Sequence, residues 1–134
     1  MSTFLKVYKA TPAFRIALIR ARVKRARLRT LAIALGVPET ALTGYLAIRP
    51  GSGELVPKAS GERVIGLMSL IGRVESFAVG NESNGFNAAK WLGAWLSTPL
   101  PALGGTRPGS YLDTIAGQEF LCALLGMTES GTYA

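Results

Sequence analysis

The sequence contains no histidine, so it lacks the side chain most used for proton transfer near neutral pH and a common metal ligand. It also lacks paired catalytic carboxylates, a Cys/His cluster, and a phosphate-binding loop with its lysine. These absences argue against an enzyme, a metal site and a bound cofactor. The function is therefore expected to lie in binding.

The chain is also poor in cysteine and in long hydrophobic runs. Its single cysteine, Cys122, stands in the apolar run 120–124, so an intrachain disulfide is excluded and a small buried side chain is expected. The apolar runs at 31–35 and 64–71 are far shorter than the roughly 20 residues that a membrane-spanning helix needs. We expect a soluble protein of the reducing cytoplasm that does not act on membranes.

Acidic residues are absent from the first 38 positions, and Glu39 is the first of them. Residues 1–63 carry twelve Lys or Arg and three Glu, a net charge of +9. Residues 64–134 carry three Lys or Arg and five Asp or Glu, a net charge of −2, together with both tryptophans. This division predicts polyanion binding in the first half and protein binding in the second.

Thr11 followed by Pro12 is typical of a helix start, and the predicted helix runs from Pro12 to about Arg27. The eleven residues before it show no clear period. Apolar residues recur on two opposite sides of this helix, with Phe14 and Leu18 on one and Ile16, Ile19 and Val23 on the other. Such a helix must bury both sides. A homodimer through Ile16, Ile19 and Val23 and a helix buried twice within one subunit remain open.

Residues 28–46 have the spacing of a helix-turn-helix. Its defining positions are Leu31, Ala32, Leu35, Gly36, Val37, Leu42 and Tyr45. Gly36 permits the left-handed conformation that ends the first helix, and Ala32 lets the second approach closely. On the second helix, Thr40 and Thr43 are the candidates to reach base edges. Phosphate contacts are expected from the basic strip Arg22, Lys24, Arg25, Arg27 and Arg29.

The remaining pattern is helical, so the predicted fold is all-α. Residues 49–53 predict a mobile loop, and apolar periodicity predicts a helix over 61–79. Asn84 is the predicted cap of a helix over 85–97 that carries Trp91 and Trp95, with Trp95 in the core. A last helix is expected over 115–126, capped by Asp113 or Thr114.

The C-terminal stretch has a dense, ordered motif. Its positions are Trp95, Leu96, Pro99, Ala102 to Gly105, Pro108, Leu112 to Thr114, Gly117, Leu124 to Gly126, Glu129, Gly131, Tyr133 and Ala134. This order resembles the toxin-binding domain of the Xre/MbcA/ParS antitoxins, the partners of RES-domain toxins. Tyr111 departs from the leucine usual in that family, and Met127-Thr128 replaces a common Arg-Ile pair.

The resemblance implies a type II antitoxin that inhibits a RES-domain, NAD-degrading toxin and represses its own operon by binding operator DNA. The basic dimerisation and helix-turn-helix region would be 1–58, and the toxin-binding domain 59–134. The tail residues Gly131, Thr132, Tyr133 and Ala134 are predicted to block the toxin's active site, with Trp91, Leu100 and Tyr111 holding the surrounding surface.

Two other functions remain open. The first is a transcriptional repressor whose C-terminal half only dimerises or senses a ligand. The second, a membrane-active basic helix, is disfavoured because the basic helix carries two apolar faces.

Overall fold

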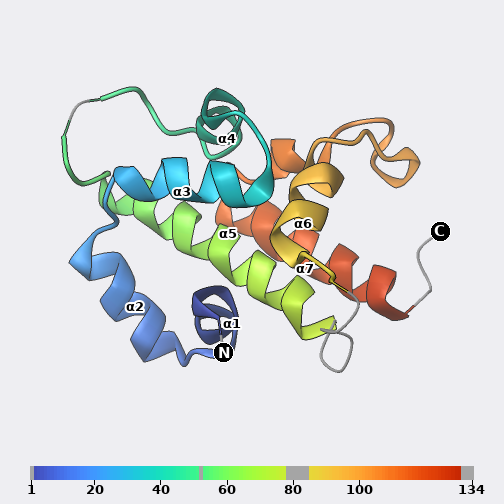
Figure 1. Ribbon diagram of the computed structural model, residues 1–134, viewed down its shortest axis with the longest axis horizontal. Coiled ribbons are helices and arrows are strands. Elements are labelled where there is room, and N and C mark those ends of the chain that lie inside the picture. Colours follow the sequence, from blue (N-terminus) through green and yellow to red (C-terminus); the bar gives the residue numbers. More distant parts are fainter. Residues whose placement is uncertain (1, 52, 78–84, 131–134) are drawn as a thin grey trace.

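The computed structural model describes residues 2–51, 53–77 and 85–130, without the side chains of 129 and 130. These residues form seven α-helices and two short 3-10 helices, and the pairing between Lys24 and Leu55 is an isolated bridge. The all-α prediction is confirmed for this part of the chain. Figure 1 shows the helices gathered around one long central helix.

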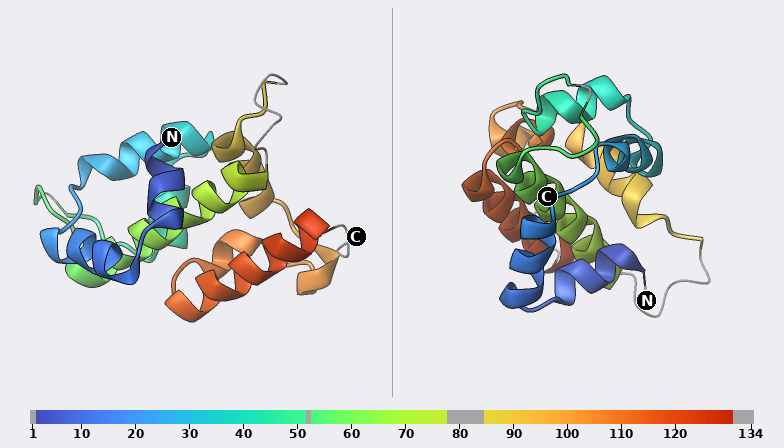
Figure 2. Two further views of the ribbon diagram at one scale, coloured as in Figure 1. Left: turned by 90° about the horizontal axis from the view of Figure 1, so that it is seen from below. Right: turned by 90° about the vertical axis from the view of Figure 1, so that its left-hand side faces the viewer.

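The central helix is α5 (Lys58–Phe77), which is buried at positions along its whole length. Helix α7 (Ile115–Ser130) lies on one side of it, and α1 (Thr3–Lys9) and α3 (Ala26–Leu35) lie on the other (Figure 2). The buried apolar side chains form one cluster that draws on residues before and after position 58. The predicted boundary between 1–58 and 59–134 therefore falls in the first turn of α5. Residues from both ranges pack against this helix.

Helix α1 occupies a segment in which the sequence shows no clear period. The hydroxyl of Ser2 accepts the amide hydrogen of Leu5 at 3.1 Å, which caps its start. Gly72 of α5 has no side chain, so the carbonyl oxygen of Phe4 can approach where a Cβ atom would lie. The guanidinium of Arg15 then donates to the carbonyls of Val7 and Tyr8 at the end of α1. Long-range contacts with α5 thus stabilise this helix.

Helix α2 (Pro12–Ala21) begins as predicted, with the Thr11 hydroxyl accepting from the amide of Phe14 at 3.2 Å. Its predicted end at Arg27 is wrong. Arg22 adopts a positive φ of 65°, and the chain turns aside to pair with residues 54–56. No residue of α2 is fully buried.

The predicted helix-turn-helix consists of α3 and α4 (Glu39–Tyr45). Gly36 ends α3 in the left-handed conformation, with φ of 71°, and Ala32 and Leu42 are buried between the helices. These expectations are confirmed because they depend on contacts within about fifteen residues of chain.

Helix α6 (Ala88–Leu96) crosses α3 at Gly93, where a Cβ atom would lie only 1.9 Å from the carbonyl oxygen of Leu35. Its cap is Asn87, whose side chain accepts from the amide of Lys90, and the predicted cap Asn84 lies outside the described residues. The helix is accordingly shorter than the predicted range 85–97. Two short turns, η2 (Pro101–Leu103) and η3 (Pro108–Tyr111), connect α6 to α7.

Helix α7 packs on the rest of the fold through the buried Leu121, Leu124 and Leu125 and also through one buried polar side chain. Nε2 of Gln118 donates to the carbonyl oxygens of Arg63 and Leu112, both at 3.0 Å. Gly66 of α5 provides the space, since a Cβ atom there would overlap the Gln118 side chain. Thr114 accepts from the amide of Gly117 at 2.9 Å, so it is the cap. The helix continues past the predicted end at residue 126.

Candidate functional site

Two arginines of the predicted DNA-binding strip are held by the segment 53–56. Nε and Nη2 of Arg22 lie 3.2 and 3.0 Å from the carbonyl oxygen of Val56, and Nε of Arg25 lies 2.8 Å from that of Gly53. Main-chain bonds run alongside, from the amide of Arg25 to Glu54 and from that of Val56 to Val23. Neutral carbonyls fix these guanidinium groups without cancelling their charge.

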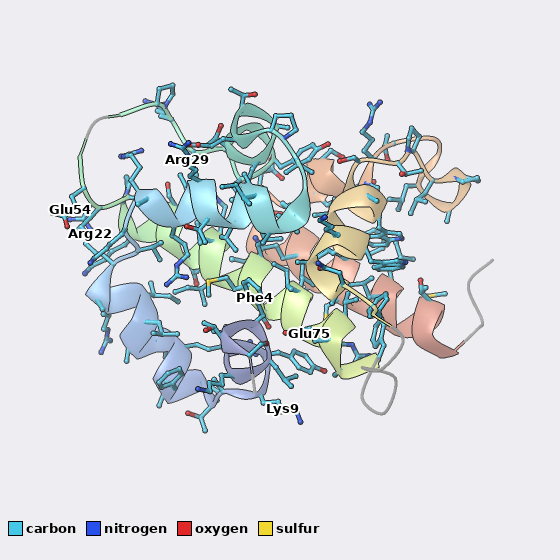
Figure 3. The ribbon with its side chains drawn as sticks, viewed as in Figure 1. Phe4, Lys9, Arg22, Arg29, Glu54 and Glu75 are labelled. Carbon is cyan, nitrogen blue, oxygen red and sulfur yellow. The ribbon has the colours of Figure 1, made fainter. Side chains whose placement is uncertain are left out.

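The other members of the strip lie at the surface. Lys24, Arg27 and Arg29 are exposed. Figure 3 shows Arg22 beside Glu54 near the start of α3 and Arg29 farther along that helix. The five basic residues therefore follow the linker before α3 and the first turns of that helix.

The surface of α4 is weakly polar. Glu39, Thr40 and Gly44 are exposed, whereas Thr43 is half-buried and its hydroxyl donates to the carbonyl of Thr40 at 3.1 Å. At the other end, Nε of Arg63 donates to the carbonyl of Leu46 at 2.7 Å and so caps α4 from α5. The structure thus fixes α4 firmly and leaves Thr40 as its most accessible hydroxyl.

Aromatic side chains form two pairs in the C-terminal half. Trp91 and Trp95 stack with their ring centroids 6.2 Å apart, and Trp95 is buried as predicted while Trp91 is half-buried. The ring centroids of Tyr111 and Phe120 are 5.4 Å apart, and the side chain of Phe120 is 45% exposed. Phe120 was missed by sequence reasoning.

An exposed apolar face runs along α7. It consists of Ala116, Phe120, Ala123 and Met127, which we call the α7 outer stripe. Their spacing of four, three and four residues places them on one side of a helix, and this spacing is the signal that could have identified them. Large exposed apolar patches are typical of sites where another protein binds.

The segment between α6 and α7 is a shaped turn. The amide of Leu100 donates to Thr106 and its carbonyl accepts from Gly105, while Gly104 and Gly105 both have positive φ. Nε of Arg107 donates to the carbonyl of Ser97 at 3.0 Å. These bonds fix the half-buried Leu100 between the two helices.

Some predicted site residues are separated or not described. Ile16 and Ile19 line one groove beside α2, and Val23 lines the groove on its other side. The structure therefore does not bring these three residues to one face. The tail residues Gly131, Thr132, Tyr133 and Ala134 lie outside the described residues.

Two features of other protein classes are missing from what the structure describes. Within residues 2–51, 53–77 and 85–130, no three His, Cys, Asp or Glu side chains are grouped to hold a metal ion. Across the same ranges, no helix has the length and apolarity needed to cross a membrane.

Comparison with known proteins gives two matches. The sequence model of the antitoxin Xre/MbcA/ParS C-terminal toxin-binding domain matches residues 85–131, which contain α6, both aromatic pairs and the α7 outer stripe. A curated protein of Sphingobium sp. (strain YBL2), named Prs ADP-ribosylating antitoxin, is 33% identical over 136 aligned positions. That alignment spans 96% of this chain and 86% of the relative.

Proposed function

The chain belongs to the Xre/MbcA/ParS antitoxins, and we propose that it inhibits a RES-domain, NAD-degrading toxin and represses its own operon. Membership of this family implies that the binding partner is a toxin. The name of the Sphingobium relative refers to ADP-ribosylation, a reaction in which NAD donates the ADP-ribose group. That chemistry supports a NAD-consuming partner. The chain acts by binding and not as an enzyme, in the cytoplasm where it meets both toxin and DNA.

The observation that carries the toxin-binding role is the exposed apolar surface within the matched domain. The α7 outer stripe, Tyr111, Leu100 and Trp91 offer aromatic and aliphatic side chains that are exposed or half-buried. Buried aromatic anchors dominate the affinity of most protein interfaces. The toxin therefore docks on the second region, 59–134, with Phe120 as a central anchor.

The tail then blocks the toxin's active site. The aromatic ring of Tyr133 suits a pocket that accepts a flat ring. Docking through α7 and occlusion by Gly131 to Ala134 are separate steps, so they can be tested separately.

The docking test uses the antitoxin co-expressed with its toxin. Phe120→Glu places a charge in the contact and should abolish co-purification, while Ile33→Glu should not, because Ile33 is 69% exposed on α3. Both variants should keep the wild-type helical circular dichroism. A toxin complex that survives Phe120→Glu contradicts the docking surface.

The occlusion test deletes residues 131–134. The truncated protein should still bind the toxin but should no longer inhibit NAD hydrolysis. Full inhibition by the truncated protein would overturn active-site occlusion while leaving toxin binding in place. Absence of any toxin partner would instead favour the repressor whose C-terminal half only dimerises or senses a ligand.

DNA binding rests on the helix-turn-helix and its basic strip. Arg22, Lys24, Arg25, Arg27 and Arg29 neutralise phosphates, while Thr40 and Thr43 contribute to sequence choice. Arg29 is the best residue to replace because its side chain is exposed. Arg22 also donates to the carbonyl of Val56, so its replacement would change the structure as well as the charge. Arg29→Ala should reduce the log–log salt slope of operator affinity by about one, and Lys90→Ala in α6 should leave the slope unchanged. Equal slopes for both variants contradict a phosphate contact at Arg29.

Assembly as a homodimer is supported by α2, which has no buried residue. Ile16 is 45% exposed and Phe14, on the opposite groove, is 50% exposed. The second copy would cover the groove lined by Ile16 and Ile19, whereas Val23, the third residue expected in the contact, lines the cavity on the other side of α2. Ile16→Glu should give monomers by light scattering and Phe14→Glu should not; the reverse result would move the interface to the other groove.

A further inference from the structure

A cavity of about 540 Å³ opens between α1, α2, α3 and α5. Its apolar wall includes Val7, Phe14, Leu18, Ile65 and Met68. Val7 and Met68 belong to the buried core, whereas Phe14 is half exposed at the mouth. Cavities of roughly 300–1,000 Å³ with mostly apolar walls are the usual size for small-molecule sites. The space is thus large enough for a ligand with a hydrocarbon body.

The charged side chains that line this cavity all have one sign. Lys6, Arg22, Lys24 and Arg27 line it, and no acidic residue stands among the described residues of its lining. Arg22 is fixed by two bonds to the carbonyl of Val56. Helix α3 begins at Ala26, which also lines the cavity, so the positive end of its dipole lies in the wall. Such a rim favours a negatively charged group.

A second groove on the other side of α2 provides a contrast within the molecule. It measures about 340 Å³ and is lined by Glu62 and Glu119 as well as Arg15. The cavity and this groove are both apolar inside. Among the charged residues of their linings, those of the cavity are all positive, whereas those of the groove include two glutamates. The charge pattern is therefore specific to one side of α2.

We propose that the cavity bounded by α1, α2, α3 and α5 binds a small amphipathic anion, a carboxylate with a medium-length hydrocarbon chain. The chain would lie against Phe14, Leu18 and Met68, with the carboxylate at the rim beside Lys6 and Arg27. A second copy of this protein is a poor occupant through its own α1 and α2, because residues 1–38 contain no acidic side chain. Inorganic phosphate would leave the apolar wall uncovered.

The site would also affect DNA binding, a consequence that rests on the proposed function. Arg22, Lys24 and Arg27 belong both to the cavity rim and to the strip proposed to contact phosphates. A bound carboxylate would lower the positive potential of that strip, so the ligand and DNA would oppose each other. Lys6 lines the cavity but does not belong to the strip, so a Lys6 variant tests ligand binding separately from DNA binding.

The experiment titrates the full chain, without DNA, with decanoate by isothermal titration calorimetry below the micelle concentration. We expect saturable one-to-one binding. Octanoate should bind more weakly by about three- to fourfold for each methylene removed. Decyltrimethylammonium, with a chain of the same length and the opposite charge, and inorganic phosphate should not compete.

Matched variants locate the site. Lys6→Gln and Arg27→Gln should each weaken decanoate binding by about three- to tenfold, whereas Arg20→Gln should not, because Arg20 is exposed on α2 outside the lining. Ala21→Trp at the mouth should block binding while thermal unfolding shows an intact fold. No binding, equal binding of decyltrimethylammonium, or equal weakening by Arg20→Gln would overturn the proposal. None of these results depends on toxin or operator binding.

Discussion

The contact between α3 and α6 offers a sharp test of how the two halves of the protein are joined. A Cβ atom at Gly93 would lie 1.9 Å from the carbonyl oxygen of Leu35, about 1.5 Å inside the 3.4 Å at which ordinary contact begins. It would also lie 2.8 Å from the carbonyl carbon and 3.1 Å from Cβ of Leu35. Leu35 is buried and ends α3, so its carbonyl cannot move without lifting α3 from α6.

Two opposing effects set the size of the change in Gly93→Ala. Overpacking costs typically about 1–3 kcal/mol and occasionally more, while alanine in a helix gains roughly 1 kcal/mol over glycine. The overlap is with main-chain atoms that have no alternative rotamer, which places the cost at the upper end of its range. We therefore expect a net loss of about 1–3 kcal/mol in the free energy of unfolding.

Urea unfolding followed by circular dichroism measures this loss, and a lower melting temperature should accompany it. Gly44→Ala is the matched control, because Gly44 is also helical and a Cβ there meets nothing within 4 Å. The control should be stabilised by up to about 1 kcal/mol. A Gly93→Ala protein as stable as the control would refute the close approach of α3 and α6.

Three further predictions concern stability. Gln118→Leu removes two buried hydrogen bonds, to the carbonyl oxygens of Arg63 and Leu112, and should lower the free energy of unfolding in urea by about 1–3 kcal/mol. An unchanged unfolding midpoint would contradict a stabilising role of this side chain. Thr114→Ala should cost about 0.5–2 kcal/mol in the same assay because it removes the cap of α7, whereas Asp113→Ala should stay within about 0.5 kcal/mol. Arg63→Met uncaps α4 and should speed amide exchange in α4 without changing exchange in the middle of α7; uniform acceleration would indicate a global effect instead.

Several features of the fold are local enough to be predicted from the sequence. Gly36, Ala32 and Leu42 specify the pairing of α3 with α4 because their roles depend on the left-handed turn and on residues a few positions away. Thr11 and Pro12 likewise specify the start of α2. The end of α2 could not be predicted, since it depends on pairing between residues 22–25 and a segment about thirty residues farther along the chain.

The candidate site divides in the same way. The sequence alone indicated an all-α chain with a basic first half and an aromatic second half whose ordered motif points to the antitoxin family. Periodicity, charge and motif order are properties of the chain itself. The tertiary structure decided that Phe120 joins Tyr111 on an exposed face, and that Ile16 and Val23 line different grooves. It also decided that Gly66, Gly72 and Gly93 lie where α5 or α6 closely approaches another helix. Burial and close approach depend on which helices meet, and only the packing of distant segments determines that.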